Sequence, residues 1–134
     1  MPNATEVVTA FLFRQGNVLI VRRSRAVGTY AGRWSAISGY VEHSPLEQAL
    51  IEIEEETGLR AEDVRLLVQA TPIEMEDAHL QRRWRVYPFA FEVVTPKPIR
   101  LDWENVEYRW APPAELRNFD TVPGLAEALD RVWP

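Results

Sequence analysis

Residues 39–59, GYVEHSPLEQALIEIEEETGL, hold the strongest pattern in this chain. They carry five glutamates from Glu47 to Glu56 and no lysine or arginine. Like charges one helical turn apart repel each other by roughly 0.2–0.5 kcal/mol per pair, so a helix usually offsets them with basic residues. Here the first basic residue is Arg60. A helix of this composition indicates a place where a cation is held.

The ends of this helix can be predicted from local signals. Ser44 is expected to cap the N-terminus, because Pro45 suits the first helical position and Glu47 completes a capping box. Gly58 is placed just past the C-terminus, where glycine readily takes the left-handed conformation. The helix is therefore expected to occupy residues 45–57.

The glutamates gather on one side of the predicted helix. At about 100° per residue, the apolar face comprises Leu46, Ala49, Leu50, Ile53 and Thr57. Glu52, Glu55 and Glu56 lie on an adjacent arc, and converging carboxylates suit Mg²⁺ or Mn²⁺. A solvated acidic surface is the simpler alternative. The missing basic partners and the tight turn at Ser38-Gly39, where backbone carbonyls can point inward, favour the metal site.

Length and composition set the class of protein. The 134 residues are expected to form one domain, residues 1–134, with 46% apolar residues to build its core. The net charge of −5 argues against a dedicated nucleic-acid binder. No apolar run reaches membrane-spanning length, no signal-peptide pattern opens the chain, and there is no cysteine. We therefore expect a soluble cytoplasmic protein without membrane partners.

The remaining elements indicate an α+β fold, a mixed sheet between helices. Residues 6–14 and 17–23 are expected to form a hairpin around a turn at residues 15–17. Residues 74–81, EMEDAHLQ, are interpreted as an acidic loop. Thr121 is the expected N-cap of a C-terminal helix. The other strands are expected near residues 34–37, 40–42, 64–70, 83–94 and 106–110, with a helical turn at 113–116 and the last helix at 122–132.

The glutamate helix resembles the signature of the Nudix hydrolase family, G-x5-E-x7-R-E-U-x-E-E-x-G-U, in which U is a bulky aliphatic residue. Residues 52–59, EIEEETGL, match the second half without a mismatch. Residues 34–42, WSAISGYVE, are similar to the strand and turn that enter the signature, and residues 104–116 resemble the end of the family domain. The resemblance spans most of the chain and implies a Nudix-type α/β/α sandwich.

Two features depart from the signature. Ile51 stands where the family has arginine, and the first signature glutamate falls on Pro45 when counted from Gly39. The segment before the helix is two residues shorter than the pattern. In the family, the arginine helps to hold the catalytic carboxylates, and the missing glutamate can serve as a ligand or a base. The departures therefore predict slow or metal-demanding hydrolysis.

The resemblance implies an Mg²⁺- or Mn²⁺-dependent hydrolase. It would cleave a pyrophosphate bond in a nucleoside diphosphate linked to another moiety. The implied metal ligands are Glu52, Glu55, Glu56 and the backbone carbonyl of Ser38. Glu55 and Glu104 are the expected catalytic residues. Glu104 lies six positions before Trp110, a spacing at which some members place a loop glutamate over the metal, although a solvated loop residue is nearly as good an interpretation.

The small-molecule nucleotide would need further contacts. Arg22, Arg25 and Arg83 are candidates for phosphate or ribose, although balancing the acidic helix is a simpler role for any one of them. Tyr40 is a candidate for stacking on a base. ADP-ribose, dinucleoside polyphosphates and oxidised nucleotides all remain open as substrates, and a homodimer is among the expected assemblies. Two alternatives are a catalytically weak or silent module that binds a nucleotide or a protein, and an isomerase or other enzyme that uses the same fold.

Overall fold

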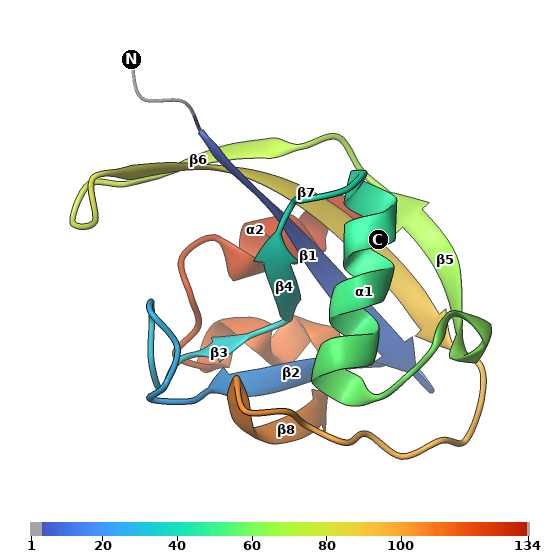
Figure 1. Ribbon diagram of the computed structural model, residues 1–134. Helices are drawn as coiled ribbons and strands as arrows, with labels where there is room; N and C mark the ends of the chain where they lie inside the picture. The colour runs from blue at the N-terminus through green and yellow to red at the C-terminus, as the bar shows by residue number, and fades with distance from the viewer. Residues whose placement is uncertain (1–3, 134) are drawn as a thin grey trace.

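The computed structural model describes residues 4–133, in which eight strands form one mixed sheet covered by helices on both faces (Figure 1). The strands are β1 (Thr5–Arg14), β2 (Asn17–Arg23), β3 (Trp34–Ser35), β4 (Ile37–Tyr40), β5 (Val64–Gln69), β6 (Ile73–Asp77), β7 (Arg82–Val93) and β8 (Asn105–Ala111). The helices are α1 (Pro45–Thr57) and α2 (Leu125–Val132), with 3-10 helices η1 (Ala61–Asp63) and η2 (Pro113–Asn118). Within residues 4–133, no helix is long and apolar enough to cross a membrane.

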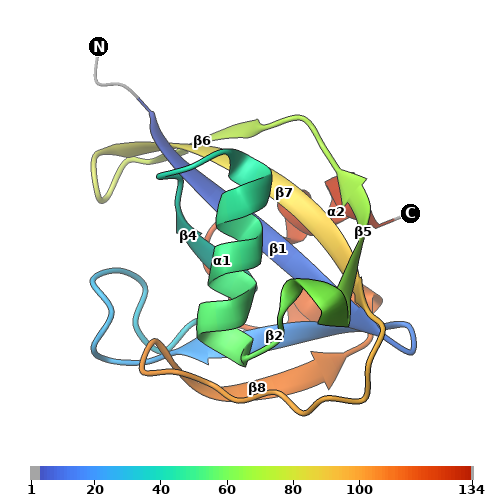
Figure 2. The same cartoon turned by 45° about the vertical axis from the view of Figure 1, so that its right-hand side comes forward.

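The sheet is built around β1 and β7, which run parallel to each other. β1 also pairs antiparallel with β2 and with β4, and β7 pairs antiparallel with β5 and β6. β2 adds β3 and β8 at the other edge. Helix α1 follows β4 and lies over β1 and β4, so the glutamate helix crosses the centre of the sheet (Figure 2).

The central strands β1, β2 and β7 are buried on both faces, as expected for a sheet between two helical layers. Successive strand residues point to opposite faces, so Leu12 packs under α1 while its neighbour Phe11 packs under α2. The α1 side is filled by Ile53 and by Phe89 and Phe91 of β7. The other side is filled by residues of β2, η2 and α2, among them Ile20, Leu116 and Leu129. The predicted α+β class and α/β/α sandwich are confirmed.

The ends of α1 follow the local signals in the sequence. The Ser44 hydroxyl accepts a hydrogen bond from the Glu47 N–H at 3.3 Å, and Pro45 occupies the first turn. Gly58 ends the helix in the left-handed conformation at φ 77°, and its N–H donates to the Glu54 carbonyl at 2.9 Å. The predicted N-cap, first position and C-terminal glycine are confirmed.

The C-terminal helix begins later than predicted. It starts at Leu125, because Gly124 has φ 80° and cannot continue a right-handed helix towards the N-terminus. The N-cap is therefore Gly124, and the prediction of Thr121 was wrong. Thr121 instead forms a parallel bridge with Trp34 of β3, which fixes the segment before the helix to the sheet.

Residues 74–77 belong to a strand, so the prediction of an acidic loop over residues 74–81 was wrong there. β6 pairs with β7 and leads into a turn in which Gln81 has φ 52°. Opposite charges face each other across the pair: Glu74 bonds Arg85 at 2.6 Å, and Glu76 lies 3.4 Å from Arg83. Cross-strand ion pairs of this kind let a strongly charged segment form a strand.

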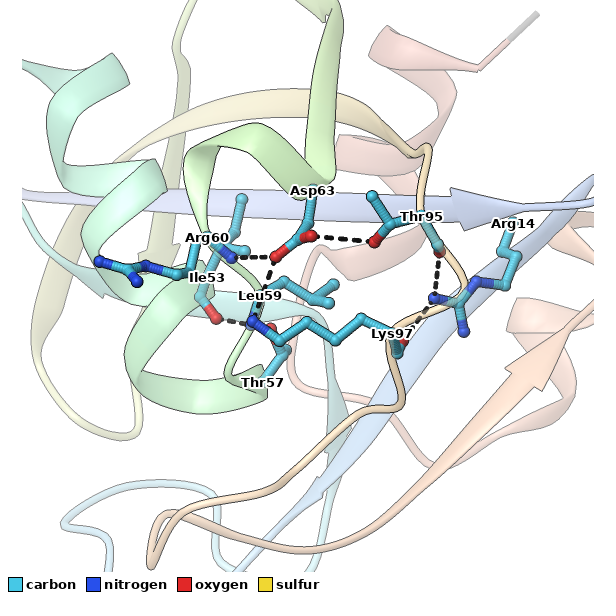
Figure 3. A network of polar contacts seen from close by, with 8 residues as sticks. All are labelled: Arg14, Ile53, Thr57, Leu59, Arg60, Asp63, Thr95 and Lys97. Atoms are coloured by element: carbon cyan, nitrogen blue, oxygen red, sulfur yellow. Dashed lines mark hydrogen bonds and ion pairs between the residues drawn. The ribbon is translucent and has the colours of Figure 1, made fainter.

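A polar network fixes the chain that follows α1 (Figure 3). The buried Asp63 carboxylate accepts from the Arg60 N–H at 2.8 Å and from the Thr95 hydroxyl at 2.9 Å, and Lys97 Nζ lies 3.3 Å away. Arg14 donates to the carbonyls of Thr95 and Lys97 at 3.1 and 2.8 Å. These contacts join the C-terminal end of α1 to β1 and to the segment after β7, which continues towards residue 104.

Candidate active site

Three carboxylates from two segments converge beside α1. Glu52 and Glu56 come from consecutive turns of the helix, and Glu104 comes from the segment between β7 and β8. One carboxylate oxygen from each lies within 4.8 Å of the other two. Glu52 and Glu56 are buried, and Glu104 is half-buried. A spacing of four residues on the helix places the first two carboxylates on one side, and the loop glutamate closes the group.

Neutral donors orient the two buried carboxylates. The Gln48 side-chain amide donates to Glu52 Oε2 at 2.7 Å. The Asn105 side-chain amide donates to Glu56 Oε1 at 3.0 Å, and the Ser38 backbone N–H donates to Glu56 Oε2 at 3.3 Å. These contacts come from α1, β8 and β4, so three elements of the fold hold the carboxylates in place.

Two hydrogen bonds of its own backbone fix the position of Glu104. Its N–H donates to the Asp102 carboxylate at 3.1 Å, and its carbonyl accepts from the Ser24 N–H at 2.8 Å. The first contact is a local turn in which the aspartate side chain bonds the backbone two residues on. The second ties the segment to the end of β2. The loop glutamate is therefore fixed in position relative to the helix.

Burial and mutual repulsion disfavour the charged forms of these groups. Burial, as the main cause, raises the pKa of Glu52 to about 7, and the charges of Glu55 and Glu104 contribute further. The pKa of Glu56 is raised well above its usual range by burial and then by Glu104, and that of Glu104 is raised by burial and then by Asp102. Within residues 4–133, no ion pair neutralises any of the three. A divalent cation with a preference for oxygen ligands fits this donor set.

Gly39 makes room for Glu52. A Cβ atom added at Gly39 would lie 2.5 Å from Glu52 Oε2 and 2.6 Å from its Cγ, closer than real contacts allow. The backbone at Gly39 is fixed by pairing with Val8 of β1. Only glycine therefore lets the Glu52 carboxylate lie directly against β4.

The cluster borders a cleft of about 570 Å³. Glu52, Glu55 and Glu104 line it, together with the aromatic side chains of Tyr30, Tyr40, Trp84 and Trp103. The Tyr40 and Trp84 rings are nearly parallel, with centroids 6.5 Å apart and planes 28° apart, and Tyr40 is 52% exposed. The Tyr30 hydroxyl donates to Asp77, which links the segment after β2 to β6. The cleft thus joins acidic groups to flat apolar surfaces.

The comparisons with known proteins agree with this arrangement. A family model described as the NUDIX domain matches residues 4–132. This chain belongs to the Nudix family. It is a pyrophosphohydrolase, an enzyme that acts on acid anhydrides. Nudix hydrolases generally use divalent metals, and the acidic cluster offers carboxylate oxygens to such an ion.

Solved structures share the Nudix fold over almost the whole chain. The MutT protein from Methanosarcina mazei Go1 is 24% identical with a TM-score of 0.75, covering 96% of this chain and 92% of that one. The Ap4A hydrolase of C. elegans is 13% identical with a TM-score of 0.76, covering 96% and 94%. A Nudix hydrolase from Nitrosomonas europaea is 19% identical with a TM-score of 0.78, covering 96% and 88%. No curated protein matched this sequence.

The structure of this Nudix protein places the predicted metal and catalytic residues in two groups. Glu52, Glu56 and Glu104 come together, and the backbone N–H of Ser38 contacts Glu56. Glu55 lies on the same side of α1 but is exposed, and it lines the cleft outside the three-carboxylate group.

The predicted substrate contacts are more scattered. Tyr40 lines the cleft. Arg22 pairs with Glu107 on β8 at 3.0 Å, Arg25 is exposed, and Arg83 pairs with Glu76. None of these three arginines lines the cleft, within the residues that the structure describes. Their role as substrate contacts stays a prediction.

Several cleft residues were not among the predicted site residues. Arg23, rather than its neighbours, faces the cleft, and it is fixed by donating to the Thr29 carbonyl at 2.8 Å. Alternation along β2 could have separated Arg23 from Arg22, since successive strand residues face opposite sides. Gln48 and Asn105 carried no signal, because an amide in a helix or at the start of a strand has many ordinary roles.

Proposed function

We propose that this Nudix protein is an Mg²⁺- or Mn²⁺-dependent hydrolase. It cleaves the pyrophosphate bond of a nucleoside diphosphate linked to another moiety. The observation that carries the proposal is the convergence of Glu52, Glu56 and Glu104 within 4.8 Å at one end of an aromatic-lined cleft. The cation, when bound, neutralises diphosphate oxygens and acidifies water.

The residues of the chain have distinct proposed roles. Glu52, Glu56 and Glu104 hold the cation, with the Ser38 carbonyl as a further ligand. Glu55 is an exposed carboxylate on the cleft wall, free of the amide contacts that bind the buried pair, and it receives a proton or adds a ligand. Glu104 lines the cleft from outside α1, so it is the second candidate for accepting a proton.

The cleft walls supply orientation and the exclusion of water. Tyr40 and Trp84 present flat faces on which a nucleobase stacks. Arg23 is the arginine that lines the cleft, and its guanidinium is positioned for a phosphate oxygen. The phosphates of an anionic substrate would therefore lie near the metal, which supplies most of the positive charge in the site. The nucleobase would be held by contact with the aromatic rings.

The products formed from candidate substrates identify the reaction. Purified protein should release mononucleotide from nucleoside diphosphate derivatives when Mg²⁺ is present, and chromatography of the products shows which bond is cleaved. The panel should include ADP-ribose, dinucleoside polyphosphates and oxidised nucleotides. Nucleotides that raise the melting temperature without any turnover would indicate a silent binding module instead.

A further inference from the structure

Side-chain amides hold the two buried carboxylates, and within residues 4–133 neither carboxylate pairs with a cationic side chain. Gln48 donates to Glu52 at 2.7 Å and Asn105 donates to Glu56 at 3.0 Å. Gln48 is 4% exposed and Asn105 is 6% exposed, so water does not compete with either contact. Hydrogen bonds from neutral donors fix the carboxylates without placing a positive charge beside them.

The amide of Gln48 can face only one way. Its Oε1 accepts a hydrogen bond from the Glu42 backbone N–H at 3.0 Å, and a backbone N–H can only donate. The carbonyl side of the amide must therefore face Glu42, which leaves the NH₂ group for Glu52. The side-chain NH₂ group of Asn105 faces Glu56 Oε1 at 3.0 Å.

Gln48 also joins the two places where the chain departs from the family signature. Glu42 lies in the segment before α1 that is two residues short. Ile51, which stands at the arginine position, lines the cleft next to Glu52 and offers no donor. One end of Gln48 thus holds the short segment, and its other end holds Glu52, the glutamate that directly follows the arginine position in the chain.

We propose, resting on the proposed function, that Gln48 and Asn105 are positioning residues which hold Glu52 and Glu56 for the metal in place of a cationic side chain. An arginine would hold the carboxylates and also add a positive charge that opposes the metal. The amides provide the orientation alone and add no positive charge to the cluster. Removing a hydrogen-bond partner of a metal ligand typically weakens metal affinity about 10–100-fold.

Direct binding of Mn²⁺ to the metal-free protein tests this proposal without nucleotide. Isothermal titration should compare the unaltered protein with Gln48→Met and Asn105→Leu, which keep the approximate side-chain volume and lose the donor. We expect each variant to bind Mn²⁺ about 10–100-fold more weakly. Gln69→Met is the matched control, because Gln69 is exposed on β5 away from the cleft, and its affinity should be unchanged.

A rescue experiment separates positioning from general damage to the fold. Ile51→Arg should recover Mn²⁺ affinity in the Gln48→Met protein and give no gain in the unaltered protein. If Gln48→Met does not fold, the Mn²⁺ affinity of Asn105→Leu is compared with that of the unaltered protein instead. Mn²⁺ binding by both amide variants as tight as that of the unaltered protein would overturn the positioning role and leave the metal site standing. Failure of the unaltered protein to bind Mn²⁺ would overturn the proposed function as well.

Discussion

Gly39 lies directly against the carboxylate of Glu52, and this contact leaves no space for a side chain at residue 39. An alanine there would force Glu52 to turn away, since the β4 backbone is paired with β1 and cannot easily move. We therefore predict that Gly39→Ala weakens Mn²⁺ binding about 10-fold or more, as the loss of a contact that orients a metal ligand typically does. The melting temperature without metal should change little, because only the end of a flexible side chain has to move.

Gly28→Ala is the control for this substitution. Gly28 also borders the cleft, but within residues 4–133 no atom other than those of its chain neighbours lies within 4 Å of the position that its Cβ would occupy. Titration calorimetry should show Mn²⁺ affinity close to that of the unaltered protein. Equal affinities for the two alanine variants would show that Glu52 is not held against Gly39 when the metal binds.

Glu56→Gln should abolish the stabilisation of the protein by metal. Glu56 is buried between Ser38 and Asn105, and its replacement removes one of the three converging charges. A ligand at 100 times its dissociation constant stabilises a protein by about 2.7 kcal/mol, so the rise in melting temperature should be easily measured in the unaltered protein. Scanning fluorimetry with and without Mg²⁺ provides the comparison.

The matched control lies on the same helix. Glu54 is exposed on the other flank of α1 and does not line the cleft. Glu54→Gln should therefore retain the metal-dependent rise in melting temperature. A normal rise in the Glu56→Gln protein would remove Glu56 from the metal site.

Asp63 is expected to stabilise the protein at neutral pH and to lose this effect in acid. The hydrogen bond from the Arg60 N–H is the main cause that lowers the pKa of Asp63, with contributions from Thr95 and Lys97. The folded protein therefore binds this proton less readily than the unfolded chain. The contribution is fully present above the unfolded pKa of about 3.9 and disappears as the pH falls through the lower folded value.

Urea unfolding of Asp63→Asn against the unaltered protein measures this effect. The difference in midpoint should be largest at about pH 7 and should shrink at about pH 3.5. Asp120→Asn serves as the control, since Asp120 is exposed and lies 4.0 Å from its partner Arg33. A difference for Asp63→Asn that is constant with pH would mean that its charge has no role in stability.

Tyr40→Leu should raise KM for nucleotide substrates and leave kcat little changed. The stacking of one base on an aromatic ring is worth about 1–3 kcal/mol, which corresponds to roughly 5–150-fold in affinity. Tyr108→Leu is the matched control, because Tyr108 is 40% exposed on β8 and does not line the cleft. Steady-state kinetics in which both leucine variants have the same KM would exclude Tyr40 from the base site.

The sequence predicted the glutamate helix well because its signals are local. A capping serine, a proline in the first turn and a terminal glycine act within a few residues, and the structure shows each in place. β6 was not predicted as a strand because its glutamates are balanced by arginines on β7, and only the tertiary structure reveals this pairing. The roles of Gln48 and Asn105 were not predicted for a similar reason: their partners Glu52 and Glu56 become buried only when α1 packs on the sheet.

Glu104→Gln should lower kcat by at least about 100-fold, the lower limit expected for the loss of a general base. Glu104 is the one cluster carboxylate outside α1, and its backbone is fixed by Asp102 and Ser24. Glu107→Gln is the matched control, because Glu107 pairs with Arg22 at 3.0 Å on partly exposed side chains, where an ion pair contributes about 0–1 kcal/mol. Measuring Mn²⁺ affinity alongside kcat distinguishes the roles of Glu104: a fall in kcat alone indicates the base, and a parallel fall in affinity indicates a metal ligand. Equal kcat values for the two variants would leave Glu55 as the remaining candidate for the base.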